Sequence, residues 1–157
     1  MVERSEGAYG FTVPLHIDLA RGTLDGRPVF GLSEAAITSS LGPPSYVEHY
    51  TRRVDLGYGS RSRPRVEVIV TGTAWAIELE DPADVEARLG LLLALPPTAL
   101  QARIAARYAG VFRLVRSYHC DAKGCFGLFW NRDGSRRIIF GTSRGHRYVG
   151  LQLTQHP

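Results

Sequence analysis

Apolar and polar residues alternate along three neighbouring segments in the middle of the chain, 53–58, 65–71 and 73–80. In the second segment Val66, Val68 and Val70 share one parity and Glu67 has the other. Such a period of two is typical of a strand with one buried face. Gly72 stands where a tight turn between the last two segments needs a glycine. The pattern therefore predicts an antiparallel meander that ends near residue 80.

A helical spacing of apolar residues predicts three helices, 33–41, 81–95 and 98–110. Ser33 suits the N-cap of the first helix, and Gly42 ends it. Asp81 followed by Pro82 begins the second in the same way. Gly110 closes the third.

Strand-like runs also occupy both ends of the chain. One or two short strands are expected within 9–32, and four more are expected at 111–118, 125–131, 136–141 and 147–153. Asp, Asn, Ser and Gly fill the short gaps between the last four runs, as turns require.

These elements predict a single α+β domain over residues 1–157, a mainly antiparallel sheet with about three helices packed on it. A helix followed by a strand meander occurs twice, in 33–80 and in 98–153. Either the chain contains an internal duplication, or one continuous sheet carries the helices on one face. The expected core residues are Val66, Val68, Val70, Trp75, Ile77, Leu79, Leu100, Ile104, Phe112, Leu114, Ile138 and Phe140.

The composition, 44% hydrophobic and 22% charged, is that of an ordinary globular protein. No run approaches the roughly 20 apolar residues of a membrane span, and the polar start lacks the pattern of a secretory signal. We therefore expect a cytoplasmic protein without membrane contact. Glycine-rich phosphate loops are missing, so no cofactor is expected.

Two cysteines and two histidines form the first candidate site, His119, Cys120, Cys125 and His146. Thiolate and imidazole are zinc ligands, and with a base they also serve nucleophilic catalysis. Cys120 and Cys125 flank a short turn, so a disulfide across a hairpin is a further alternative to free thiols. A small hydrolase or nuclease using this region stays open, although no local motif frames it.

Arginine supplies nearly all of the positive charge behind a net charge of +4. It clusters in two segments that are expected to be loops, Arg61, Arg63 and Arg65 in one, and Arg132, Arg136 and Arg137 in the other. Tyr58 and Trp130 are candidate stacking partners beside them, so a nucleic-acid-binding protein is one alternative.

The stretch from Gly31 to Pro44, with Leu41-Gly42-Pro43 closing a helix, leads to Leu56-Gly57-Tyr58-Gly59 and a hairpin ending at Leu79. It resembles BamE/SmpA-like small lipoproteins and the bacterial immunity proteins that neutralise polymorphic toxins. The lipoprotein type is expected to begin with a signal peptide and a lipid-bearing cysteine. Neither pattern is found at the start of this sequence, which favours the immunity type. That resemblance implies a non-catalytic domain that binds another protein, a toxin domain, and blocks it by occlusion.

Overall fold

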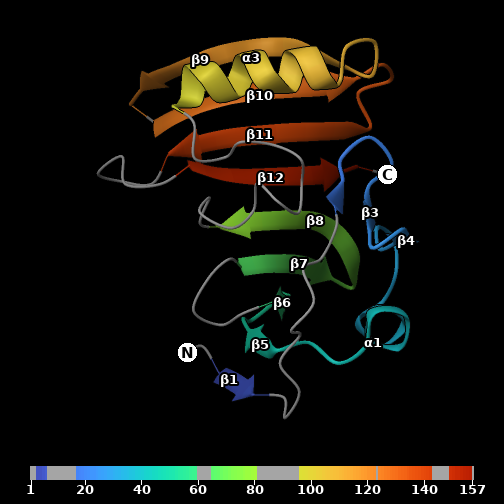
Figure 1. Ribbon diagram of the computed structural model, residues 1–157. Helices are drawn as coiled ribbons and strands as arrows, with labels where there is room; N and C mark the ends of the chain where they lie inside the picture. Colours follow the sequence, from blue (N-terminus) through green and yellow to red (C-terminus); the bar gives the residue numbers. More distant parts are fainter. Residues whose placement is uncertain are drawn as a thin grey trace.

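The computed structural model describes residues 3–6, 17–59, 65–80, 96–122, 124–142 and 149–156. Within them, one nine-stranded antiparallel sheet has the order β1-β5-β6-β7-β8-β12-β11-β10-β9 (Figure 1). Its strands in chain order are β1 (Glu3–Glu6), β5 (Tyr46–His49), β6 (Val54–Gly59), β7 (Arg65–Thr71), β8 (Thr73–Glu80), β9 (Phe112–Asp121), β10 (Gly124–Asn131), β11 (Arg136–Thr142) and β12 (Val149–Gln155).

Two helices and a small sheet complete the described structure. The small sheet contains β2 (Ile17–Asp18), β3 (Thr23–Leu24) and β4 (Arg27–Pro28), and the helices are α1 (Glu34–Leu41) and α3 (Pro97–Arg107). Figure 1 shows α3 lying along β9 and β10 at one end of the large sheet, while α1 lies near its other end. Neither described helix has the length and apolarity needed to cross a membrane.

One face of the large sheet is the core. Strand register places a row of buried apolar side chains across six strands, Leu56, Val68, Ile77, Leu153, Ile138 and Phe129. The buried residues of α1 and α3, including Ile37 and Ile104, belong to the same cluster. Both helices therefore pack on this face, which is a stable two-layer arrangement.

The first predicted helix is confirmed together with its end signals. The Ser33 hydroxyl accepts a hydrogen bond from the Ala36 amide at 3.2 Å, and Gly42 ends the helix with φ +87°. The last predicted helix is also found, as α3. The described residues thus contain two helices where three were expected, because the segment 81–95 lies outside them.

The mainly antiparallel sheet is confirmed, but two of the expected core residues, Trp75 and Leu114, are not buried. A β-bulge between Ile69 and Val70 leaves Trp75 without a directly opposite residue, so the simple alternation stops there. Trp75 is consequently only half-buried, and its Nε1 donates to Thr71 Oγ1 at 3.2 Å. Leu114 is 41% exposed because its strand lies at the edge of the sheet.

The two expected helix-plus-meander halves meet at the centre of one continuous sheet. The last strand of each half, β8 or β12, pairs antiparallel with the other, and Leu79 lies opposite Leu151. This arrangement matches the continuous-sheet alternative, and the internal duplication stays a prediction.

Candidate binding surface

An arginine–tryptophan stack lies on the face of the sheet opposite the core. Arg113 on β9 and Arg137 on β11 stand directly across from Trp130 on β10, so the three side chains share one face. The Cζ atom of Arg137 is 4.7 Å from the centroid of the Trp130 ring, and that of Arg113 is 5.9 Å away. Both distances fit cation–π contacts.

A second arginine–aromatic contact extends this face along β9. The Cζ atom of Arg116 lies 3.7 Å from the centre of the Phe126 ring, and its Nη2 is 2.9 Å from Asp121 Oδ2. Together Arg113, Arg116, Phe126, Trp130 and Arg137 form what we call the arginine–aromatic face. It combines positive charge with flat apolar rings, the two properties that recur in binding hot spots.

The edge strand β9 adds apolar side chains that have little cover. Val111, Leu114 and Val115 are 41%, 41% and 42% exposed, and among the described residues they make up most of the large hydrophobic side chains exposed to this degree. We call these three residues the apolar edge. No described strand pairs with the outer side of β9, although Gln101 Oε1 of α3 accepts from the Tyr118 amide at 2.6 Å.

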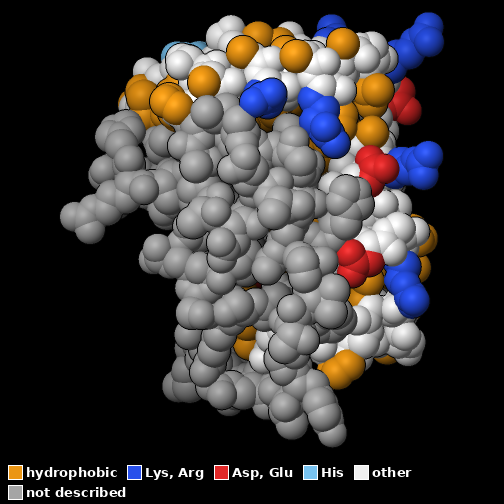
Figure 2. Space-filling model, viewed as in Figure 1, with side chains coloured by type: hydrophobic (Ala, Val, Ile, Leu, Met, Phe, Trp, Pro, Cys, Tyr) orange, Lys and Arg blue, Asp and Glu red, His pale blue; other side chains and the backbone are white. Residues whose placement is uncertain are grey.

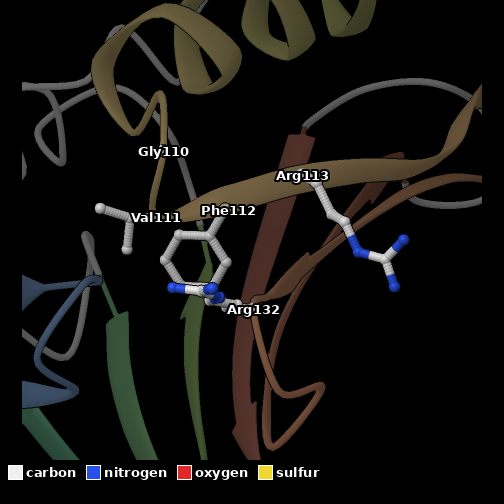
Figure 3. A pocket seen from close by; sticks show the side chains of 5 residues that line it. All are labelled: Gly110, Val111, Phe112, Arg113 and Arg132. Carbon is white, nitrogen blue, oxygen red and sulfur yellow. The ribbon is translucent and has the colours of Figure 1, made fainter.

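A pocket of about 190 Å³ opens beside the apolar edge. Its lining comes from the start of β9 and the turn after β10, namely Gly110, Val111, Phe112, Arg113 and Arg132. In Figure 3 the Arg132 side chain lies near the Phe112 ring, while Arg113 points away from both. A broader hollow of about 620 Å³ shares Gly110, Val111 and Arg132 and adds Asn131 and Asp133.

The turn between β10 and β11 presents Arg132 to this pocket. Asp133 Oδ1 accepts hydrogen bonds from the Ser135 amide at 2.9 Å and from the Ser135 hydroxyl at 2.6 Å. These bonds hold the pKa of Asp133 below its ordinary value. Gly134 has φ +74°, which a residue with a side chain rarely adopts, and its amide donates to the Asn131 carbonyl. The turn is therefore well defined, with Arg132 exposed in it.

The same outer face becomes acidic toward the other half of the sheet. Arg53 makes two hydrogen bonds of 2.7 Å to the Asp55 carboxylate, which raise the pKa of the Arg53 guanidinium, and Asp55 is almost fully buried. Tyr46 donates to Glu67 Oε1 at 2.5 Å, and both residues are buried. Among the described residues of this face, the arginines without a carboxylate partner, Arg113 and Arg137, lie on β9 and β11.

The cysteines of the candidate chemical site form a disulfide. Cys120 and Cys125 lie directly opposite each other on β9 and β10, and the structure joins their sulfurs. In this state neither sulfur is a thiolate, so neither can attack a substrate or bind a metal. His119 is exposed, its Nδ1 is 2.9 Å from the Ser117 carbonyl, and His146 lies outside the described residues. The described residues include no cluster of three or more metal-binding side chains.

The structure separates the arginines predicted from the second loop. Trp130 and Arg137 come together in the arginine–aromatic face, and Arg132 lines the neighbouring pocket. Arg136 has the opposite parity to Arg137 and makes contacts within the fold. Its guanidinium donates to the Ala20 carbonyl and, at 3.1 Å, to Gln155 Oε1. Burial lowers the pKa of Arg136.

The other predicted binding residues are not part of this surface. Tyr58 is completely buried, and its hydroxyl donates to the Gly42 carbonyl at 3.2 Å, so its ring offers no surface for stacking in this structure. Arg61 and Arg63 lie outside the described residues. Arg65 is described only through its backbone, opposite Gly59 and Glu80.

Sequence reasoning missed Arg113, Arg116 and Phe126, because it searched for arginines in loops. All three lie on strands, and Arg113 and Arg116 are three apart, which ordinary alternation would place on opposite faces. One register shift in the β9–β10 pair, between Leu128 and Phe129, lies between them along β9 and brings both to the same face. Trp130, which the sequence already offers as a candidate stacking residue, was the available signal that this face carries aromatic residues.

In Figure 2, Lys and Arg side chains stand out around the upper part of the molecule, where Figure 1 places α3 and β9, with hydrophobic side chains between them. No protein family matches the chain, and no curated protein or solved structure is significantly similar to it.

Proposed function

We propose that this chain is a non-catalytic protein-binding domain that holds an acidic partner at β9. The observation that carries the proposal is the apolar edge, where Val111, Leu114 and Val115 are each more than 40% exposed within five consecutive residues. Exposed apolar side chains that lie close together in the chain favour an interaction site. The resemblance of residues 31–79 to toxin-neutralising immunity proteins suggests a bacterial toxin as the partner.

The charges around the apolar edge support an acidic partner. Arg113 and Arg132 flank the pocket, and within the described residues neither forms an ion pair with a carboxylate. A partner with acidic residues around an apolar or aromatic anchor would match this surface in charge and shape. Inhibition by occlusion needs such a rigid surface and no catalytic group.

The experiment compares affinity capture by the tagged protein and two variants from a nuclease-treated lysate of the source organism. Leu114→Asp places a negative charge in the apolar edge, where exposure makes the change tolerable for folding. Thr73→Asp adds the same charge at an exposed position in the hairpin between β7 and β8. We expect a partner retained in equal molar amount by the wild type and by Thr73→Asp, and at least about tenfold weaker binding by Leu114→Asp. Equal retention by both variants would refute the proposed surface.

A nucleic-acid-binding protein is the second candidate, and the Arg113–Trp130–Arg137 stack favours it. Arginines beside an aromatic ring can contact phosphates and a stacked base. The two candidates differ in their response to salt, because a phosphate binder weakens steeply between low and physiological salt. Retention of nucleic acid alone, lost after nuclease treatment, would replace the first proposal with this one.

The compartment is also a proposal. The sequence favours the cytoplasm, whereas the Cys120–Cys125 disulfide is typical of oxidising compartments. A thiol titration of protein isolated under alkylating conditions from its source cells decides between them. Two free thiols would support the cytoplasm, and none would support an oxidising location.

A further inference from the structure

Five buried polar side-chain atoms of the described residues have no hydrogen-bond partner, and three of the five lie on adjacent strands. They are Nε1 of Trp130 on β10, Nε of Arg137 on β11 and Oγ1 of Thr154 on β12. Strand register places Trp130 opposite Arg137 and Arg137 opposite Thr154, so the three side chains form one continuous row on the outer face. Buried polar atoms without partners are rare in folded proteins, and three in one row call for an explanation.

The chemistry of this row suits an oxyanion. An indole N–H and a guanidinium N–H can only donate hydrogen bonds, and a threonine hydroxyl can donate one as well. Thr154 is only 3% exposed, so bulk water does not satisfy its hydroxyl. A ligand that accepts several hydrogen bonds and carries negative charge would complement all three atoms.

The surrounding charges favour the same kind of ligand. Within the described residues the Arg137 guanidinium contacts the Trp130 ring and pairs with no carboxylate. Arg113 adds a second positive charge on β9, on the other side of Trp130. Beyond Thr154 the row continues to Ala76, which contributes only a methyl group and no competing acceptor.

We propose that Trp130, Arg137 and Thr154 form a binding site for a small oxyanion, either a carboxylate or a phosphate. This site is distinct from the apolar edge of β9, so the inference does not depend on the proposed protein partner. The same chemistry would recognise a free metabolite or an acidic group of a larger ligand, and the two oxyanions used in the test distinguish carboxylate from phosphate.

The test uses Trp130 as its own reporter. The chain has two tryptophans, and replacing the other one, Trp75→Phe, leaves the fluorescence of Trp130 alone. We would titrate this variant with inorganic phosphate and, separately, with acetate, at constant ionic strength maintained with chloride. A saturable change in fluorescence with at least one of the two oxyanions is expected, accompanied by a higher midpoint of thermal unfolding.

Two substitutions in the Trp75→Phe background locate the site. Thr154→Val removes the hydroxyl while nearly keeping the shape, and Arg137→Gln removes the charge; each should weaken binding about tenfold or more. Arg103→Gln, which removes one charge from an exposed position on α3, is the matched control and should bind as the parent does. Absence of a saturable response to both oxyanions, or equal binding by Arg137→Gln and Arg103→Gln, would overturn the proposal.

Discussion

Gly57 on β6 has no room for a side chain, because the ring of Tyr46 on β5 lies directly over it. A Cβ atom built at Gly57 would be 2.1 Å from Cε1 and Cζ of Tyr46, far inside the ordinary carbon–carbon contact of about 3.5–4.0 Å. The two residues are paired across the strands, and Tyr46 is 1% exposed. Gly57→Ala must therefore move the ring and weaken its 2.5 Å hydrogen bond to Glu67.

The expected loss of stability combines two costs. Overpacking a tight interior costs about 1–3 kcal/mol, and losing a hydrogen bond to a charged group costs about 1.5–3 kcal/mol. We expect Gly57→Ala to lower the free energy of unfolding by about 2.5–6 kcal/mol, measured by equilibrium unfolding in urea.

A control variant and a double-mutant cycle test whether the Tyr46 ring causes this loss of stability. Gly72→Ala meets no atom within 4 Å, but Gly72 has φ +73°, so its cost is one of backbone strain, about 1 kcal/mol. In a Tyr46→Ala background the clash is gone, and Gly57→Ala should then cost little. A cost for Gly57→Ala no greater than that of Gly72→Ala, or unchanged without the Tyr46 ring, would show that the ring is not the cause.

Three further predictions concern single interactions of the fold. Burial raises the pKa of Tyr58 to about 12 from its ordinary 10.0, so the unfolded chain ionises first and stability should fall between those pH values. Urea unfolding across this range should show a smaller fall for Tyr58→Phe, and parallel curves would contradict the assignment. Arg53→Ala leaves the buried Asp55 carboxylate unpaired and should cost about 3–5 kcal/mol, whereas Asp55→Asn leaves only the half-exposed Arg53 and should cost less. Equal urea midpoints for these two variants would disprove the asymmetry. Reducing the Cys120–Cys125 disulfide, whose cysteines are 5 positions apart, should cost about 2 kcal/mol by the loop-entropy relation. A Cys120→Ser, Cys125→Ser variant should then unfold identically with and without reductant, and no effect of reductant on the wild type would contradict the estimate.

Local chemistry made much of this fold predictable. The cap at Ser33, the stop at Gly42 and the hairpin glycine at Gly72 each act within a few residues, and all three appear where expected. Tyr58 was predictable too, because it shares the parity of Leu56, a core residue. The expectation that Tyr58 is a stacking partner at the surface did not take this alternation into account.

Two kinds of feature could not be predicted from the sequence. They are the pairing of strands that are distant in the chain and the bulges that shift the register between strands. Nothing in the local pattern indicates that β8 pairs with β12 rather than with another strand. The bulge at Trp75 and the two register shifts in β9 each break the period of two on which parity arguments rest. The arginine–aromatic face follows from those shifts together with the β9–β10–β11 pairing, so only its individual residues were visible beforehand.

The pairing of β8 with β12 has a consequence for the order in which the chain can fold. The strands of each meander are neighbours in sequence and can pair as soon as they are synthesised. The β8–β12 pair, which is the seam at the centre of the sheet, can form only after β12, the last described strand along the chain. Closing the seam brings together residues as distant in sequence as Leu79 and Leu151, which makes it the slow step by contact order. Until then β8 is an edge strand whose backbone N–H and C=O groups on the β12 side are unpaired. During synthesis, the first meander therefore has to remain soluble with its future centre open to solvent.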